Sequence, residues 1–260
     1  GGYGRAELSP GSDLDILILH NDSLSQDELS EFANKLLYPM WDTKSVDHSV
    51  RTRIQTRDAA HDDLKVALGL LDIRLVCGDA DLVAAVQHDS MDSWRKESRK
   101  RLPQLRLSLE ERHERAGELA YLLEPDLKEA RGGLRDINAL RAIKMSGAVD
   151  IALERISWAE STLASVREAL HEVTKKNRDR LLFQEQDLVA KHLEYGDADL
   201  LMSDVARAAR SVDYLLNSTW HRIDSKGKDG LGRILRKPRT TPLGGGISVA
   251  HQEVVIDELE

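Results

Sequence analysis

The sequence has little cysteine, few aromatic side chains and no long apolar run. The one cysteine, Cys77, cannot form an internal disulfide bond, which favours a protein of the reducing cytoplasm. It follows Leu75 and Val76 in an apolar run, so we expect a buried structural thiol and not a catalytic one. No stretch approaches the roughly 18 consecutive apolar residues of a membrane-spanning helix, and no signal peptide is present. We therefore expect a cytoplasmic protein without membrane contact.

Basic charge is also scarce. Lysine and arginine number 37 against 45 acidic residues, and the net charge of -8 argues against non-specific nucleic-acid binding over the whole surface. Residues 223–246 are locally basic, with side chains at Lys226, Lys228, Arg233, Arg236, Lys237 and Arg239. No aromatic residues are interleaved with them, so a solvated linker is favoured over a nucleic-acid patch.

The first 90 residues show the pattern of a small sheet backed by helices. Strands are predicted over residues 14–19 and 45–51, with a helix between them that Pro39 ends. The apolar face of that helix is predicted from Leu29, Phe32, Leu36 and Leu37. A helix over residues 57–76 follows, closed by Gly78, and a further helix begins at Asp81.

The remainder of the chain is predicted to be helical up to residue 222. Amphipathic stretches continue from residue 91 and recur over 134–146, 159–175, 181–194 and 199–220. Gly147 and Gly196 mark breaks between helices, and residues 247–256 alternate enough for a hairpin or an edge strand. The expected fold class is α+β. A small mixed-sheet domain (residues 1–90, lacking its N-terminal part) precedes an all-α bundle (91–222), then a basic linker and short β-like tail (223–260).

Two aspartates at the start of the first strand carry the chemistry. Asp13 and Asp15 project from the same side of a strand, because successive side chains alternate between faces. Two adjacent carboxylates repel each other, and a hard cation such as Mg²⁺ relieves that conflict while leaving positions for water and phosphates. The glycines at positions 1, 2 and 4 allow backbone N–H groups to approach an anion closely.

Either feature alone has an ordinary explanation. A lone Gly-Gly-x-Gly is usually a turn, and a lone Asp-x-Asp on an exposed strand is usually solvated. Here both occur together, in the order that a phosphate cradle and a metal site require. No Gly-Lys-Ser/Thr follows the glycines, so the segment is not a Walker A loop, and the strand that follows argues against a dinucleotide fingerprint. The pattern indicates phosphoryl or nucleotidyl transfer.

Three ordered motifs resemble one family. The first is Gly1-Gly2-x-Gly4-Arg5-x-Glu7-Leu8-x-Pro10-x-Ser12-Asp13-x-Asp15, which resembles the signature of the DNA polymerase β-like nucleotidyltransferases. Two others resemble the bacterial protein-PII uridylyltransferases within that superfamily: Asp47-His48-Ser49-Val50-Arg51-Thr52, and Glu124-Pro125-Asp126-Leu127-Lys128-Glu129 followed by Gly132-Gly133-Leu134-Arg135-Asp136-Ile137. The middle motif departs from the family by carrying Asp47 where glycine is frequent.

The resemblance implies a bacterial enzyme of nitrogen regulation. It would move UMP or AMP from UTP or ATP to a tyrosine hydroxyl of a PII-type signalling protein and release pyrophosphate. Family members also carry segments before the glycines, then a metal-dependent HD hydrolase domain and two ACT domains, so the chain is expected to be a truncated part whose own activity is open. The alternatives are another acceptor (glutamine synthetase, a small molecule or RNA) and an inactive nucleotide-binding regulatory fragment.

The resemblance also assigns residues to roles. Asp13 and Asp15 would hold Mg²⁺, with Mn²⁺ as a substitute, and Asp47 would be the third catalytic carboxylate or else an ordinary strand-edge carboxylate. The expected contacts to the triphosphate come from Gly1, Gly2, Arg5, Ser12 and Arg51. A surface salt bridge is the competing account for either arginine.

A second set of nucleotide contacts is expected around Gly132 and Gly133. Lys128 would lie near the triphosphate, with Arg135 beside it and Asp136 near the base or sugar. Alternatively, Glu124 and these three form a structural ion-pair cluster. The dipeptide His61-Asp62 lacks the further His and Asp of an HD hydrolase site, and we reject that interpretation.

Overall fold

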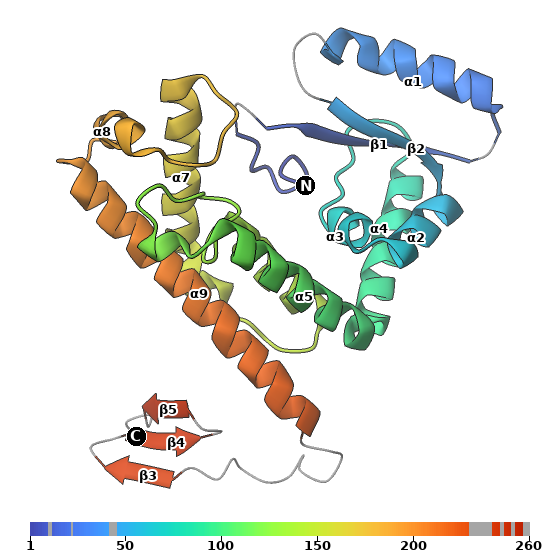
Figure 1. The fold of residues 1–260 in the computed structure, drawn as a ribbon. Helices are drawn as coiled ribbons and strands as arrows, with labels where there is room; N and C mark the ends of the chain where they lie inside the picture. Colours follow the sequence, from blue (N-terminus) through green and yellow to red (C-terminus); the bar gives the residue numbers. More distant parts are fainter. Residues whose placement is uncertain are drawn as a thin grey trace. The chain divides into compact units, whose positions relative to one another are not determined.

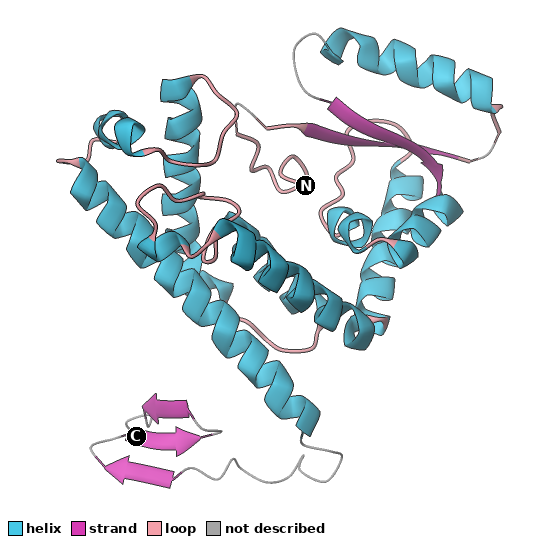
Figure 2. Cartoon of the chain, in the orientation of Figure 1, coloured by secondary structure: helices cyan, strands magenta, loops and turns pink. Residues whose placement is uncertain are grey.

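The computed structural model describes residues 1–9, 12–21, 23–41, 46–228, 241–244, 247–250 and 253–256. These residues divide into two compact units, Gly1–Leu216 and Asn217–Glu260. Helices predominate, and the chain also contains a few short strands (Figure 2). The expected mixed α and β composition is therefore confirmed.

Two parallel strands form the sheet of the first unit. β1 (Leu14–His20) pairs with β2 (Val46–Thr52) in an unbroken register, and both lie within one residue of the predicted bounds. The helix α1 (Gln26–Trp41) connects them and lies on one side of the strand pair, while α2, α3 and α4 lie on the other (Figure 1). The sequence therefore folds into a β-α-β unit, as its pattern indicates.

The predicted face of α1 is correct only in part. Its buried side chains recur at every fourth position: Leu29, Ala33 and Leu37. Phe32 and Leu36 were expected beside them but are 52% and 43% exposed, because they sit on the flank of that stripe. The helix also continues past Pro39 to Trp41. Proline removes one hydrogen bond to the turn before it, and the two residues that follow it stay helical.

The single helix predicted over residues 57–76 is two helices in the structure. They are α2 (Arg53–Asp62) and α3 (Leu64–Leu70). Asp63 separates them with extended backbone, and its carboxylate accepts a hydrogen bond of 2.6 Å from the backbone N–H of Lys65. An aspartate at this position both ends one helix and caps the next.

The expectation that Cys77 is buried is wrong. The thiol is exposed, because α3 ends at Leu70 and the apolar run around Cys77 belongs to the connection to α4 (Ala80–Lys96). Leu75 and Val76 are exposed with it. Asp79 caps α4, so this helix begins one residue before the predicted Asp81.

The rest of the first unit is helical, as predicted. Its further elements are α5 (Ser98–Ala116), the 3₁₀ turn η1 (Leu119–Tyr121), α6 (Leu134–Ser146), η2 (Leu153–Ile156), α7 (Ser157–Thr174), α8 (Phe183–His192) and the larger part of α9 (Ala198–Lys228), which continues into the second unit. Gly147 ends α6 in the left-handed conformation at φ 73°, and Gly196 lies between α8 and α9, so both predicted breaks are confirmed. The fully buried leucines of α6 and α7 are Leu140, Leu163 and Leu170.

The division of residues 1–222 into two domains stays a prediction, and residues Gly1–Leu216 form one compact unit. The boundary expected after residue 90 falls inside α4, and α4 packs against α6 through a hydrogen bond of 2.8 Å from the Trp94 indole to the carbonyl of Ala142. Within the described residues, no helix combines the length and the apolar character needed to cross a bilayer.

The C-terminal unit contains a small antiparallel sheet. Its strands are β3 (Thr241–Gly244), β4 (Ile247–Ala250) and β5 (Glu253–Ile256), in that order. The pairing of β4 with β5 matches the predicted hairpin over residues 247–256. α9 extends beyond residue 222 to Lys228, so Lys226 and Lys228 are helical, whereas Arg233, Arg236, Lys237 and Arg239 lie outside the described residues.

Candidate active site

Three carboxylates gather at the N-terminal edge of the strand pair. In the β1–β2 register Asp15 stands directly across from Asp47, and partners on parallel strands project from the same face. Asp13 immediately precedes β1 on the same side by alternation. All three side chains are exposed. We call this group, Asp13, Asp15 and Asp47, the carboxylate edge.

A glycine loop (residues 1–5) lies against the carboxylate edge. A side-chain carbon placed on Gly1 would stand 3.0 Å from Oδ2 of Asp15, so Gly1 lies directly against this carboxylate. Gly4 packs on the backbone of Asp72, whose carbonyl oxygen occupies the place where a methyl group would go. The loop closes on itself through a 2.8 Å hydrogen bond from the Glu7 N–H to the Gly2 carbonyl. The two predicted halves of the site, glycines and aspartates, are thus adjacent.

Arg5 does not reach toward a phosphate position in this structure. Its Nε lies 2.7 Å from Oε2 of Glu7, and its Nη1 forms an ion pair with Asp72. The guanidinium is therefore engaged by two carboxylates, as the salt-bridge alternative anticipated. Its evident effect is to join the glycine loop to the segment that follows α3.

Ser12 directly precedes Asp13 of the carboxylate edge, whereas Arg51 lies near the opposite end of β2. Ser12 is bonded twice to Ser9: its Oγ accepts from the Ser9 N–H at 3.2 Å, and its own N–H donates to the Ser9 carbonyl at 3.0 Å. Arg51 is in register with Leu19, so it projects from the same face as Asp47, four residues further along β2.

Asp136 has a different place from the one expected. Its side chain is fully buried, and it accepts hydrogen bonds from Arg112 Nη2 at 2.5 Å, His113 Nε2 at 2.9 Å and the Gly132 N–H at 2.7 Å. Burial acts to raise the pKa of Asp136, but the His113 hydrogen bond and the Arg112 charge outweigh it and hold the pKa below its ordinary value. The carboxylate fastens the Gly132-Gly133 turn, where φ of Gly132 is +85°, and it is closed off from a ligand.

The other charged residues of this motif form separate pairs. Lys128 Nζ lies 3.5 Å from Oδ2 of Asp179. Arg135 is half exposed and pairs with Glu129 at 2.6 Å. Glu124 accepts from the backbone N–H of Phe183. The structure therefore does not assemble Glu124, Lys128, Arg135 and Asp136 into the single ion-pair cluster that was the alternative.

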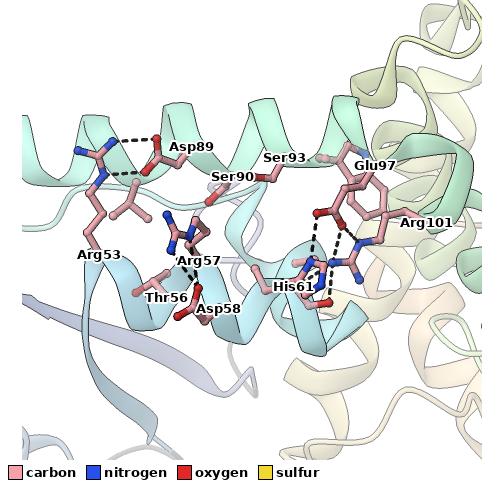
Figure 3. A pocket seen from close by; sticks show the side chains of 14 residues that line it. Arg53, Thr56, Arg57, Asp58, His61, Asp89, Ser90, Ser93, Glu97 and Arg101 are labelled. Carbon is pink, nitrogen blue, oxygen red and sulfur yellow. Dashed lines mark hydrogen bonds and ion pairs between the residues drawn. The ribbon is translucent and has the colours of Figure 1, made fainter.

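A polar cavity of about 250 Å³ lies between α2 and α4 (Figure 3). Arg53 pairs with Asp89 at one end, and Arg101 at the other pairs with Glu97 and donates to the carbonyls of α2. Thr52 ends β2 and caps α2, so this cavity lies beyond the opposite end of the strand from Asp47. Its arginines are already neutralised by carboxylates. It is distinct from the carboxylate edge, and we assign no ligand to it.

His61, in the rejected HD dipeptide, lines this cavity and hydrogen-bonds Glu97 at 3.2 Å. Among the described residues, no group of three or more His, Cys, Asp and Glu side chains is arranged to hold a metal ion by itself.

Sequence reasoning missed the residues that hold the segment between the glycine loop and β1. Arg141 of α6 forms an ion pair of 2.9 Å with Glu7, and Arg167 of α7 donates a hydrogen bond of 2.5 Å to Ser9. Figure 1 marks the N-terminus between α7 and the strand pair, in keeping with these contacts. Both arginines lie more than 130 residues from their partners, and no local pattern in the sequence announces such a contact.

Known proteins resemble this chain over most of its length. The family model described as GlnD PII-uridylyltransferase matches residues 100–146 and 149–220. A bifunctional uridylyltransferase/uridylyl-removing enzyme from Streptomyces coelicolor is 48% identical over 243 residues, covering 93% of this chain and 28% of the relative. Proteins of the same name from Mycobacterium tuberculosis H37Rv and Photobacterium profundum are each 35% identical, over 98% and 82% of this chain.

The chain covers 33% of the Mycobacterium relative and 26% of the Photobacterium relative, so it spans about a third or less of the proteins it matches. Its similarity is therefore to one part of each of these relatives. The family match, the relatives and the three motifs agree, and the chain belongs to the PII-uridylyltransferase family.

Proposed function

We propose that the carboxylate edge is a nucleotidyl-transfer site that moves UMP from UTP to a tyrosine hydroxyl of a PII-type signalling protein. The observation that carries the proposal is the register that sets Asp47 across from Asp15, with Gly1 against the same carboxylate. The relatives are named uridylyltransferases, which favours UTP over ATP as the donor. The name of the family model favours a PII protein as the acceptor.

The exposed carboxylates fit a divalent cation. Asp13 and Asp15 offer the oxygen ligands that Mg²⁺ prefers, and Mn²⁺ accepts the same set. Mg²⁺ is commonly held by one or two carboxylates and completed by water and substrate phosphates, so this site needs no third protein ligand. When bound there, the ion would supply positive charge to the triphosphate and to the attacking oxygen.

The chain's own residues would orient the donor and take up a proton. The tyrosine oxygen attacks the α-phosphorus, the bond to the bridging oxygen of the β-phosphate breaks, and pyrophosphate leaves with the bonding electron pair. Because an unperturbed tyrosine hydroxyl has a pKa of about 10, its proton needs an acceptor near neutral pH, and we assign that role to the Asp47 carboxylate. Backbone N–H groups of the glycine loop, the Ser12 hydroxyl and Arg51 hold the phosphates.

We extend the proposal to the fold. The β1–β2 unit would be the core of a polymerase β-like domain, and the helices that follow would form a bundle closing over the nucleotide. Lys128 and Arg135 flank the N-terminus of α6, a position suited to an anion, and we propose them as further triphosphate contacts. Arg5 and Asp136 are assigned to structural support, because their side chains are only 18% and 0% exposed, whereas those of Lys128 and Arg135 are 37% and 53% exposed.

The test is pyrophosphate release with Mg²⁺, a PII protein and each of the four ribonucleoside triphosphates in turn. We expect release with UTP, abolished by the double substitution Asp13→Asn and Asp15→Asn. Asp187→Asn, an exposed aspartate of α8, is the matched control and should leave the rate unchanged. The assay is run on this chain and on the chain joined to the flanking segments of its relatives.

The outcomes separate the alternatives. Release that survives the double substitution would refute the site. Release with UTP but no modified PII protein would indicate a different acceptor, such as glutamine synthetase, a small molecule or RNA. Binding of UTP without release in either form would favour a regulatory nucleotide-binding module.

A further inference from the structure

Ser9, in the segment before β1, is hydrogen-bonded to α7, a helix far away in the sequence. Arg167 of α7 donates a hydrogen bond of 2.5 Å from Nη1 to the Oγ of Ser9. Arg167 is 8% exposed, so this contact is sheltered from water. A charged donor held in such surroundings makes a stronger and more directional bond than an exposed one.

Arg167 is itself fixed in place by Asp179. Its Nε donates to Oδ1 of Asp179 at 2.5 Å, and the same carboxylate accepts from His171 Nε2 at 2.9 Å. Burial acts to raise the pKa of Asp179, but the hydrogen bond and charge of Arg167, the charge of Lys128 and the His171 hydrogen bond hold the pKa below its ordinary value. The carboxylate is therefore ionised at neutral pH and orients the guanidinium, leaving Nη1 aimed at Ser9.

From Ser9 the contact continues to the carboxylate edge. The Ser9 N–H donates to Ser12 Oγ, and the Ser12 N–H donates to the Ser9 carbonyl. Ser12 is followed at once by Asp13, the residue before β1. A continuous line of hydrogen bonds thus joins Asp179, Arg167, Ser9 and Ser12, and it ends one peptide bond from a proposed metal ligand.

The same segment has a second tie to the helices. Arg141 of α6 lies 2.9 Å from Glu7 and 2.5 Å from Glu160 of α7. Glu7 is in turn paired with Arg5 of the glycine loop. Arg141 is more exposed than Arg167, and its contact falls five residues before Ser12, so Arg167 has the more direct hold on the site.

We propose that Arg167 is a positioning residue for nucleotidyl transfer. Through Ser9 it sets where the Ser12 hydroxyl and the Asp13 carboxylate stand, without itself touching the nucleotide. The expected effect of Arg167 on the rate of transfer rests on the proposed function. Its expected effect on the positions of Ser9 and Ser12 rests on the structure alone. A misplacement of about 1 Å at reacting groups costs on the order of 100-fold in rate, so loss of this hold should be measurable.

The local consequence is tested on this chain by NMR. In Arg167→Met the backbone amide signals of Ser9 and Ser12 should shift and their hydrogen exchange should accelerate, because both bonds lose their anchor. Arg178→Met is the matched control: Arg178 pairs with Glu185 in the same helical region and is not bonded to the glycine loop or to Ser9. Unchanged Ser9 and Ser12 signals in Arg167→Met would overturn the inference.

The catalytic consequence is tested by steady-state kinetics in whichever form of the protein transfers UMP. We expect Arg167→Met to lower kcat by about 10–100-fold while KM for the PII protein stays within about twofold. Arg167→Lys should recover part of the loss, since one donor remains. Ser9→Ala should reproduce part of it, and adding Ser9→Ala to Arg167→Met should cost nothing further, as residues on one line of contacts are not additive.

The two proposals fail in different ways. If the wild-type protein transfers UMP and Arg167→Met keeps its kcat, the positioning role is refuted and the proposed function stands. If kcat falls equally in Arg178→Met, the effect is general destabilisation, and the positioning role is again refuted. If no form transfers UMP, the proposed function fails, and the NMR comparison alone decides whether Arg167 positions Ser9 and Ser12.

Discussion

The buried carboxylate of Asp136 should be the most costly single charge in the first unit to neutralise. It is 0% exposed and accepts from Arg112, His113 and the Gly132 N–H. Asn in its place keeps the shape but leaves the Arg112 guanidinium, only 8% exposed, without its counter-charge. Removing one partner of a buried ion pair costs about 3–5 kcal/mol. Because Asn still accepts one or two of these bonds, we expect Asp136→Asn to lose about 3 kcal/mol.

The measurement is urea unfolding at pH 7, followed by far-UV circular dichroism. Thermal unfolding should show the same change as a fall in Tm of about 6–12 °C for a unit of this size. The control is Asp213→Asn. Asp213 pairs with Arg131 at 2.6 Å, but the two side chains are 29% and 32% exposed, so its loss should cost about 1 kcal/mol or less. Equal losses in the two variants would refute the distinction between the buried pair and the partly exposed one.

The same carboxylate should contribute to the pH dependence of stability. The pKa of Asp136 is lower in the folded chain than its ordinary value, so its contribution is present above the unfolded pKa of about 3.9 and is lost as pH falls through the folded pKa. The free energy of unfolding should therefore fall below about pH 4 in the wild type, and part of that fall should be absent in Asp136→Asn. Parallel curves for the two proteins below pH 4 would contradict this account of the cluster.

Two further substitutions test single contacts. Trp94→Phe removes the 2.8 Å hydrogen bond to the Ala142 carbonyl and should lower the free energy of unfolding, measured in urea, by about 2 kcal/mol. An unchanged free energy of unfolding would mean that this bond does not stabilise the packing of α4 against α6. Gly4→Ala places a methyl group on the Asp72 carbonyl and should reduce pyrophosphate release about tenfold or more. The control is Gly69→Ala, which has open space around it and should leave the rate unchanged. Equal rates in the two variants would show that the glycine loop tolerates displacement.

The local features of the fold were predictable because their causes are local. The apolar run from Ile16 to Leu19 indicates β1, and Gly147 ends α6 in a conformation that glycine adopts readily. The break at Asp63 was missed because no glycine or proline marks it, and the aspartate acts through a cap that sequence alone does not distinguish from a surface carboxylate. Cys77 was misplaced because its apolar neighbours suggested a buried helix that had already ended.

The candidate site also contains features with local causes, which could be predicted, and features that depend on distant residues, which could not. The proximity of Asp15, Asp47 and Gly1 follows from strand pairing and motif order, so it could be anticipated. The burial of Asp136 could not, because an aspartate is buried only where partners neutralise it, and Arg112 stands 24 positions earlier in the chain. The hydrogen bond from Arg167 to Ser9 joins residues 158 positions apart, so it likewise depends on tertiary packing.

The most direct test of the central claim is the intact mass of a PII protein after incubation with UTP, Mg²⁺ and this chain joined to the flanking segments of its relatives. The account predicts one added uridylyl group, located on a tyrosine by peptide mapping, and its complete loss when Asp13 and Asp15 are both changed to Asn. A uridylyl group that still appears with the double variant would contradict the assignment of transfer to the carboxylate edge.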